Sequence, residues 1–232
     1  MTRICYTVVC MLIIGHRGAC GLAPENTLAS LRKAIEHHVD EIEFDLRVTK
    51  DGVPILHHDA ALTDPNGSQL LVQDHTYAEL QQHKTDLVSF DDMLAAIGHQ
   101  TRLQVEVKTG EPVAPIVVII EKYLSAGWLP EYFVLSSFDP KILRELQAAL
   151  PSIEKVVLER WSGVRASYRA RQIGTKRLSM NQKWLWWGFI SSMSKAGWKL
   201  SAYTVNDAAK ARRWQRYGLH SVITNYPDRF ET

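Results

Sequence analysis

The chain has few cysteines, and their positions do not predict a disulfide framework. Its 232 residues include only Cys5, Cys10 and Cys20, an odd number grouped near the start without metal-ligand spacing. Domains that depend on disulfides usually carry a larger and even set. The cysteine content therefore favours a reducing compartment, and we expect a cytoplasmic protein.

The chain also lacks a stretch that predicts an integral membrane segment. Residues 4–14 are apolar, but a spanning helix needs about 20 such residues. This stretch leads directly into His16 without a small-residue cleavage site, which argues against a signal peptide. We expect residues 1–10 to be a dispensable extension, with Met11 as an alternative start.

Neither sign of charge predominates over the whole chain. The 27 basic and 25 acidic residues give a formal charge of +2. We find no dense Lys/Arg run and no basic stripe interleaved with aromatic residues, so we expect no nucleic-acid binding. The basic residues between 169 and 177 are interpreted as a solvated surface.

Strands and helices alternate along almost the whole sequence, without an internal repeat. Strands are predicted at 11–15, 41–46, 103–108, 132–136, 155–159, 177–180, 199–204 and 221–224. Helices are predicted at 27–38, 112–126, 139–149, 163–172, 184–196 and 206–217. This pattern predicts an α/β fold, a closed parallel (β/α)8 TIM barrel. We predict one domain over residues 11–232, with a small insertion at about 47–102 that contains a helix at 90–97.

The most informative stretch is 41–59, which reads as a β-hairpin turning at Asp51-Gly52. With a two-residue turn, Val48 faces Ile55, Leu46 faces His57 and Asp45 faces His58. Alternation along the first strand places Glu43 and Asp45 on one face. Two carboxylates on one face need a cation between them, and oxygen ligands favour Mg²⁺ or Ca²⁺.

Two further polar clusters are predicted at the carboxyl ends of strands. His16 and Arg17 follow the first strand, and Glu106 and Lys108 share a face of the strand at 103–108. After His16-Arg17, either Asn26 or Thr27 can cap the following helix. Active sites of such barrels lie at this end of the strands, so we expect these groups to converge.

In their order and spacing these motifs resemble the glycerophosphodiester phosphodiesterase family, in particular its short cytosolic bacterial members. The motifs are HRG at 16–18, PENT at 24–27, E-x-D at 43–45, DG at 51–52, HD at 58–59 and E-x-K at 106–108. The resemblance implies a PI-PLC-like phosphodiesterase barrel in lipid and glycerol metabolism. Its substrates would be glycerophosphodiesters such as glycerophosphocholine or glycerophosphoethanolamine, and its products sn-glycerol 3-phosphate and an alcohol. The alternatives are a lysophospholipase D and a catalytically silent phosphodiester-binding barrel.

The resemblance also assigns roles to the residues. Glu43, Asp45 and Glu106 would hold one divalent metal ion, either Mg²⁺ or Ca²⁺. His16 and His58 would form the acid–base pair, because the unperturbed pKa of histidine lies near ~6.5.

Four other residues are expected to bind the substrate. Arg17 and Lys108 would neutralise phosphate charge, and Tyr203 and Asn181 could line the glycerol pocket. The neighbour of the catalytic histidine, His57, is expected to point away.

The sequence departs from the family pattern in two places. Asn225 stands where an aspartate is common, and the loop after Asp59 lacks an Arg-Thr-Thr run. We expect neither change to touch the metal or acid–base groups. The tryptophans of 184–187 are expected mainly to pack against the barrel, with at least one exposed; the alternatives are contact with a lipid chain or with a partner subunit, for example in a homodimer.

Overall fold

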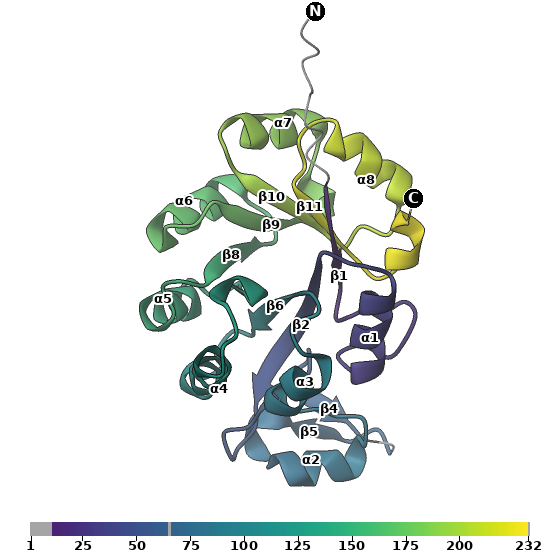
Figure 1. Ribbon diagram of the computed structural model, residues 1–232, viewed down its shortest axis with the longest axis vertical. Coiled ribbons are helices and arrows are strands. Elements are labelled where there is room, and N and C mark those ends of the chain that lie inside the picture. Colours follow the sequence, from purple (N-terminus) through teal and green to yellow (C-terminus); the bar gives the residue numbers. More distant parts are fainter. Residues whose placement is uncertain (1–10, 65, 232) are drawn as a thin grey trace, which may run out of the picture.

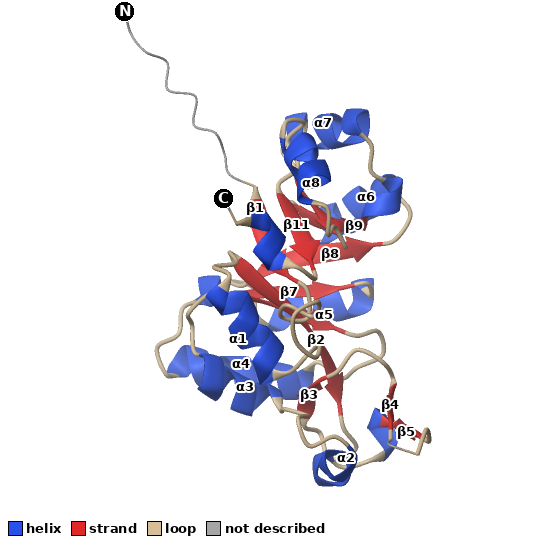
Figure 2. Ribbon diagram, turned by 90° about the vertical axis from the view of Figure 1, so that its right-hand side faces the viewer, coloured by secondary structure: helices blue, strands red, loops and turns tan. Residues whose placement is uncertain are grey.

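Eight parallel strands close into a barrel with helices on its outside (Figures 1 and 2). The computed structural model describes residues 11–64 and 66–231, so the expectations for residues 1–10, including Cys5 and Cys10, lie outside it. Around the barrel, the strands are β1 (Leu12–Gly15), β11 (Ser221–Thr224), β10 (Lys199–Tyr203), β9 (Arg177–Asn181), β8 (Glu154–Glu159), β7 (Phe133–Ser137), β6 (Arg102–Val107) and β2 (Glu41–Val48). Pairing of β1 with β2 closes the ring, which confirms the predicted TIM barrel.

The outer layer consists of helices that follow the strands. These helices are α1 (Leu28–Glu36), α3 (Phe90–Ile97), α4 (Ala114–Ser125), α5 (Pro140–Ala149), α6 (Gly163–Ile173), α7 (Trp187–Lys195) and α8 (Ala208–Gln215). Each buries one apolar side; in α5 this side is formed by Ile142, Leu143 and Leu146, which have helical spacing. Short 3-10 turns are η2 (Pro130–Tyr132), η3 (Gln182–Trp184) and η4 (Pro227–Phe230).

The pairing of β2 with β6 places a row of polar residues inside the barrel. Glu41 lies beside Arg102, Glu43 beside Gln104 and Asp45 beside Glu106. Residues of β2 between these, such as Phe44, are buried in the apolar layer under the helices. The alternation of β2 therefore directs carboxylates inward at three successive heights.

At the amino ends of the strands, a buried ion-pair network fills the barrel. The guanidinium of Arg177 donates to both carboxylate oxygens of Glu41, at 3.0 and 2.8 Å, and to Glu154 at 3.1 Å. Arg102 donates to Glu41 at 2.6 Å and to Glu154 at 3.0 Å. Glu41 and Arg177 are almost completely buried, so this end of the barrel is closed by paired charges.

Outside the ring of eight, the strand β3 (Pro54–Leu56) pairs with β2 in antiparallel orientation. The pairing does not have the predicted register. The predicted pairs were Val48–Ile55, Leu46–His57 and Asp45–His58. The observed pairs are Val48–Pro54, Arg47–Ile55 and Leu46–Leu56. The predicted register was therefore wrong by one residue.

The reason is the length of the turn between the two strands. Thr49 donates its N–H to the carbonyl of Val53 at 3.0 Å, which leaves the three residues 50–52 in the loop. The third, Gly52, has φ +79°, the left-handed conformation that completes a three-residue hairpin loop. A two-residue Asp-Gly turn would have shifted the pairing to the predicted one.

The stretch between β3 and α3 forms a small lobe with its own apolar core. It contains β4 (Ala61–Thr63), β5 (Gln69–Leu71), η1 (Val72–Asp74) and α2 (Tyr77–His83). Its core is formed by Leu62, Val72, Leu80 and Leu87, which pack with Ile55 of β3. The lobe lies at the lower end of Figure 1, where β4, β5 and α2 are labelled below α3.

The tryptophans of 184–187 do not pack against the barrel as we mainly expected. Trp184, Trp186 and Trp187 are each more than half exposed. α7 begins only at Trp187, and its buried side is formed by Ile190 and Met193. The first two tryptophans therefore precede the helix and are not part of its buried side.

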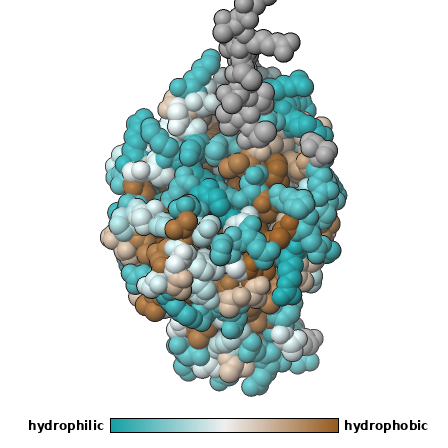
Figure 3. All heavy atoms as spheres, viewed as in Figure 1, coloured by the Kyte–Doolittle hydropathy of each residue, from teal (hydrophilic) through white to brown (hydrophobic). Residues whose placement is uncertain are grey.

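The outer surface carries no membrane-spanning element in the part of the chain that is described: every helix there is too short or too polar to cross a bilayer. On the face drawn in Figure 3, hydrophilic residues cover much of the periphery, and hydrophobic residues show between them near the middle.

Candidate active site

A cavity of about 400 Å³ opens at the carboxyl ends of the barrel strands. All nine predicted site residues line it, namely His16, Arg17, Glu43, Asp45, His58, Glu106, Lys108, Asn181 and Tyr203. The remaining lining residues, to which we assigned no role from the sequence, are Gln104, Phe138, Leu158, Arg160, Thr204 and Ile223. The cavity thus brings together residues from both halves of the chain.

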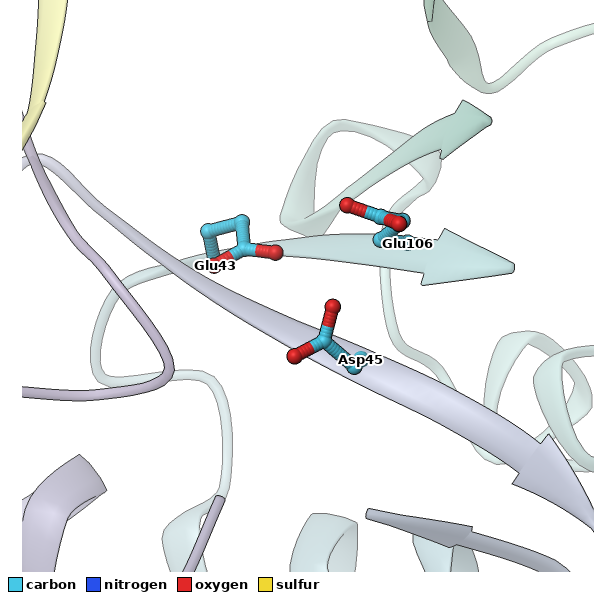
Figure 4. A group of neighbouring side chains, drawn as sticks. All are labelled: Glu43, Asp45 and Glu106. Carbon is cyan, nitrogen blue, oxygen red and sulfur yellow. The ribbon is translucent and has the colours of Figure 1, made fainter. Parts of the chain in front are cut away.

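Three carboxylates form the acidic wall of this cavity. Glu43 and Asp45 come from β2 and Glu106 from β6, and Figure 4 shows their side chains converging. One oxygen of each lies within 4.8 Å of one oxygen of each of the others, and all three residues are buried. The predicted convergence of E-x-D with the carboxylate of E-x-K is present.

Two cations partly offset this negative charge. The ammonium of Lys108 lies 2.5 Å from Asp45 Oδ1 and also contacts Glu106 Oε1. Arg17 has its Nε 3.3 Å from Asp45 Oδ2, and its Nη1 donates to both oxygens of Glu25 at 2.8 Å. Arg17 therefore spans from the acidic wall to the protein surface.

The carboxylates differ in how well their charges are compensated. Burial, together with repulsion from Asp45 and Glu106, raises the pKa of Glu43 well above its usual value. Burial alone would also raise the pKa of Asp45, but Lys108 and Arg17 hold it below its usual value. Glu43 is thus the carboxylate most in need of a further positive charge.

This donor set fits a hard divalent cation. Buried carboxylate oxygens within a few ångströms of one another are the ligands that Mg²⁺ and Ca²⁺ prefer. With no sulfur or imidazole among the three converging groups, the set does not resemble a zinc site. A cation bound at this point would offset the burial and repulsion that raise the pKa of Glu43, and would take the place of its proton.

Asn225 contacts His16, contrary to our expectation that this departure from the family pattern would be remote. The Nδ1–H of His16 donates to Asn225 Oδ1 at 2.6 Å. Parallel pairing of Gly15 with Thr224 brings the two following residues together. Burial, reinforced by the charge of Arg17, lowers the pKa of His16 to about 4, so its Nε2 is unprotonated at neutral pH.

His58 lines the cavity, whereas His57 does not. The Nδ1–H of His58 donates to Asp59 Oδ1 at 2.7 Å, and the Nε2–H of His57 donates to the carbonyl of Ala61 at 3.1 Å. The shifted hairpin register does not exchange the two rings, because β3 ends at Leu56 and regular alternation ends with it.

Asn26 has a role in the site that we did not predict. Its Nδ2 donates to Asp45 Oδ2 at 2.9 Å, and its Oδ1 accepts the N–H of Asp45 at 3.1 Å. The cap of α1 is Thr27, in a capping box with Ser30. Both Asn26 and Thr27 could have capped the helix by sequence, and only the fold shows that Asn26 fixes the carboxylate of Asp45.

The remaining wall of the cavity is formed by side chains that also contact neighbouring residues of the barrel. Tyr203 donates its hydroxyl to the carbonyl of Glu159 at 3.0 Å, and Asn181 accepts the N–H of Lys183 with its Oδ1 at 3.0 Å. The guanidinium of Arg160 lies over the ring of Phe138, 4.9 Å from its centroid. This wall combines apolar surface with one further cation.

Known proteins resemble this chain over most of its length. The model of the Glycerophosphoryl diester phosphodiesterase family matches residues 16–229. Two proteins named glycerophosphodiester phosphodiesterase are each 26% identical to this chain: that of Bacillus subtilis strain 168 over 95% of this chain and 85% of its own, and that of Caldanaerobacter subterraneus over 94% and 95%. The structure of an Oleispira antarctica phosphodiesterase in complex with the product sn-glycerol-3-phosphate is 24% identical, covers 94% of both chains and has a TM-score of 0.82.

Proposed function

Because the chain belongs to the glycerophosphoryl diester phosphodiesterase family, we propose that it hydrolyses glycerophosphodiesters to sn-glycerol 3-phosphate and a free alcohol. The observation that carries this proposal is the convergence of three carboxylates, two histidines and two cations on one cavity. Glycerophosphocholine and glycerophosphoethanolamine are the first substrates to test. This activity would belong to lipid and glycerol metabolism.

In the proposed site, Glu43, Asp45 and Glu106 hold one divalent cation, Mg²⁺ or Ca²⁺. Such an ion supplies polarisation of a phosphodiester oxygen and offsets the charge that develops during transfer. Lys108 already lies between two of these carboxylates, and it is placed to bind another phosphate oxygen as a point charge. Arg17 contacts the other carboxylate oxygen of Asp45, and it is placed to offset phosphate charge from that side.

The two histidines have partners that suit different tasks. His16 is neutral, and its Nδ1–H is fixed on Asn225, so its free Nε2 can accept a proton from the water that attacks phosphorus. His58 donates its Nδ1–H to the carboxylate of Asp59, which orients its ring at the wall of the cavity. We therefore assign His16 as the base and His58 as the acid that protonates the departing alkoxide.

A series of single variants tests this pair through release of glycerol 3-phosphate. His16→Ala and His58→Ala should each lower kcat by about 10²–10⁴-fold while leaving substrate binding measurable by calorimetry. His57→Ala is the matched control, because this ring adjoins His58 but does not line the cavity. A loss in His57→Ala as severe as in His58→Ala would contradict the assignment.

A lysophospholipase D activity is the second candidate. The observation in its favour is apolar surface at and beside the cavity, since Phe138, Leu158 and Ile223 line it and Trp161 and Trp184 are exposed close to it. A lysolipid has the same phosphodiester and an additional acyl chain that would need such a surface. Turnover of lysophosphatidylcholine faster than of glycerophosphocholine would favour this substrate.

We also propose that the protein works in the cytoplasm. Support comes from the few cysteines, of which Cys20 is a free thiol in the described part of the chain. Fractionation of cells that produce the native chain tests this location.

A further inference from the structure

The near-neutral total charge conceals a strongly basic region. Residues 160–227 contain 13 of the 27 basic residues but only one of the 25 acidic residues, Asp207. The rest of the chain is correspondingly acidic. Such a separation of charge within one domain indicates a surface that meets an anionic partner.

This basic region occupies one side of the barrel. It contains β9, β10 and β11 with α6, α7 and α8, and these helices lie together at the upper end of Figures 1 and 2. Some of its cations are neutralised, for example Arg165 and Arg169 by Glu159. Among residues 11–64 and 66–231, however, most of the others form no ion pair: Arg160, Arg171, Lys176, Lys183, Lys195, Lys210, Arg212, Arg213 and Arg216.

The same side of the barrel is also rich in exposed aromatic residues. Six of the seven tryptophans fall within residues 160–227. Four of them are largely exposed, Trp161 by 61%, Trp184 by 54%, Trp186 by 59% and Trp187 by 63%, and Val164 is 84% exposed. We call these four tryptophans, together with Val164, the aromatic rim. Exposed apolar side chains of this size, gathered in one place, mark an interaction surface.

Two glycines allow close packing at the starts of α6 and α7, beside the aromatic rim. A Cβ on Gly163, at the start of α6, would meet the ring of Phe189 from α7 at 2.4 Å. A Cβ on Gly188 would meet the ring of Trp186 at 2.0 Å. Gly163 therefore permits the contact of α6 with Phe189 of α7, and Gly188 permits the ring of Trp186 to lie close to the first turn of α7.

Two members of the aromatic rim, Trp161 and Trp184, lie next to residues that line the active-site cavity. Trp161 directly follows Arg160, and Trp184 follows Asn181 by three residues; Arg160 and Asn181 both line the cavity. Lysines flank the rim as well: Lys183 adjoins Trp184, and Lys195 lies with Trp187 around one shallow surface hollow. At the end of the barrel where substrate enters, the rim thus combines Trp161 and Trp184 with the adjoining cations Arg160 and Lys183, while Lys195 lies further along α7.

We propose that the aromatic rim and its flanking cations bind the surface of an anionic lipid membrane. Tryptophan prefers the interface between water and lipid, because its ring is apolar and its N–H is polar. Nearby lysines and arginines add attraction to anionic head groups. The protein would then lie on the membrane with its cavity mouth towards the lipid.

Other occupants fit this surface less well. In a symmetric dimer through this face, two strongly basic surfaces would oppose each other. Successive nucleic-acid bases stack on aromatic faces along a groove, whereas the rings of Trp186 and Trp187 stand at 88° to each other. An anionic membrane satisfies both the charge and the exposed rings.

Co-sedimentation with vesicles tests the proposal independently of any enzymatic activity. The wild-type protein should bind mixed vesicles of phosphatidylcholine and phosphatidylglycerol, and bind pure phosphatidylcholine much more weakly. Trp184→Ala with Trp187→Ala should weaken binding about tenfold or more. Lys183→Gln, Lys195→Gln and Lys210→Gln together, the last a residue whose ammonium contacts Gln182 beside Lys183, should also weaken binding about tenfold or more at low salt, and the difference from the wild type should shrink at high salt.

Matched variants on another side of the barrel provide the controls. Val118→Ala with Leu129→Ala removes exposed apolar surface at and after α4, and Lys33→Gln with Lys122→Gln and Lys141→Gln removes three charges from α1, α4 and α5. Both sets should bind vesicles like the wild type. The proposal is overturned by absence of vesicle binding, by equal loss in the control variants, by preferential binding of single-stranded RNA, or by a dimer that the rim variants dissociate in light scattering.

Discussion

Asn225 places a neutral amide, in place of a carboxylate, next to the ring of His16. The amide partner leaves the pKa of His16 low, at about 4, because burial and Arg17 act against the proton. In Asn225→Asp, a carboxylate would favour the imidazolium and raise the pKa of His16. Since a base must be unprotonated to act, the acid limb of the kcat/KM profile should move to higher pH, and titration of His16 by NMR should show the same direction.

Asn181→Asp is the control for this change. It adds the same charge to the cavity wall without a contact to His16. If both variants shifted the titration of His16 equally, the general charge of the cavity and not the contact with Asn225 would determine this pKa.

Asn26 should matter for metal binding more than for stability. Asn26→Ala removes two hydrogen bonds that fix Asp45, and loss of such a partner typically weakens metal affinity by about 10–100-fold. Thr27→Ala removes the adjacent helix cap and should lower the free energy of unfolding by about 1 kcal/mol with unchanged metal affinity. Calorimetric titration with Mg²⁺ or Ca²⁺ distinguishes them, and equal affinities in the two variants would refute the role of Asn26.

At this scale, alternation was enough to predict which side chains share a face. It placed Glu43 with Asp45 and Glu106 with Lys108, and all four line one cavity. It could not predict the contact of His16 with Asn225, since these residues lie 209 positions apart and meet only when the barrel closes. The sequence alone therefore could not predict the hydrogen-bond partner that adjusts the pKa of His16.

The β2–β3 hairpin shows what the sequence could not predict about a secondary-structure element. Asp-Gly correctly indicated a turn, but both two-residue and three-residue loops accept glycine at its observed conformation. The helix α2 was also missed, as the predicted insertion contained only the helix at 90–97. Strands and helices of the barrel were predicted more closely, because their apolar periods are long and regular.

Gly52 should contribute to the stability of this hairpin. Its φ of +79° is strained for any residue with a Cβ, although no neighbouring atom would clash. Gly52→Ala should therefore lower the free energy of unfolding by about 1 kcal/mol in urea denaturation. Lys50→Ala, an exposed change in the same loop, should have almost no effect; equal effects of the two would show that conformation at Gly52 is not the cause.

For the whole molecule, the buried pair of Glu41 and Arg177 should hold the closed end of the barrel together. Arg177→Met leaves Glu41 with only the contact to Arg102, and should cost about 3 kcal/mol of unfolding free energy. Glu41→Met with Arg177→Met should cost less than the sum of the two single changes. An additive result in urea denaturation would contradict direct coupling of the two charges.

The closed barrel also explains why the fold could be predicted when its internal contacts could not. Eight strands with intervening helices leave few alternatives, and parallel strands place all their carboxyl ends at one end. The site could therefore be located from strand ends alone. The uneven charge of residues 160–227 was hidden, because the acidic first two thirds of the chain balance it in the total.

The central claim is that this cavity hydrolyses glycerophosphodiesters with a divalent cation held by Glu43, Asp45 and Glu106. It is tested most directly by release of glycerol 3-phosphate from glycerophosphocholine, measured with Mg²⁺, with Ca²⁺ and with excess chelator, for the wild type beside Glu43→Gln. We predict turnover with at least one ion, loss with chelator, recovery when the ion is restored, and no recovery in Glu43→Gln. Turnover that persists in chelator, or in Glu43→Gln at the wild-type rate, would contradict the claim.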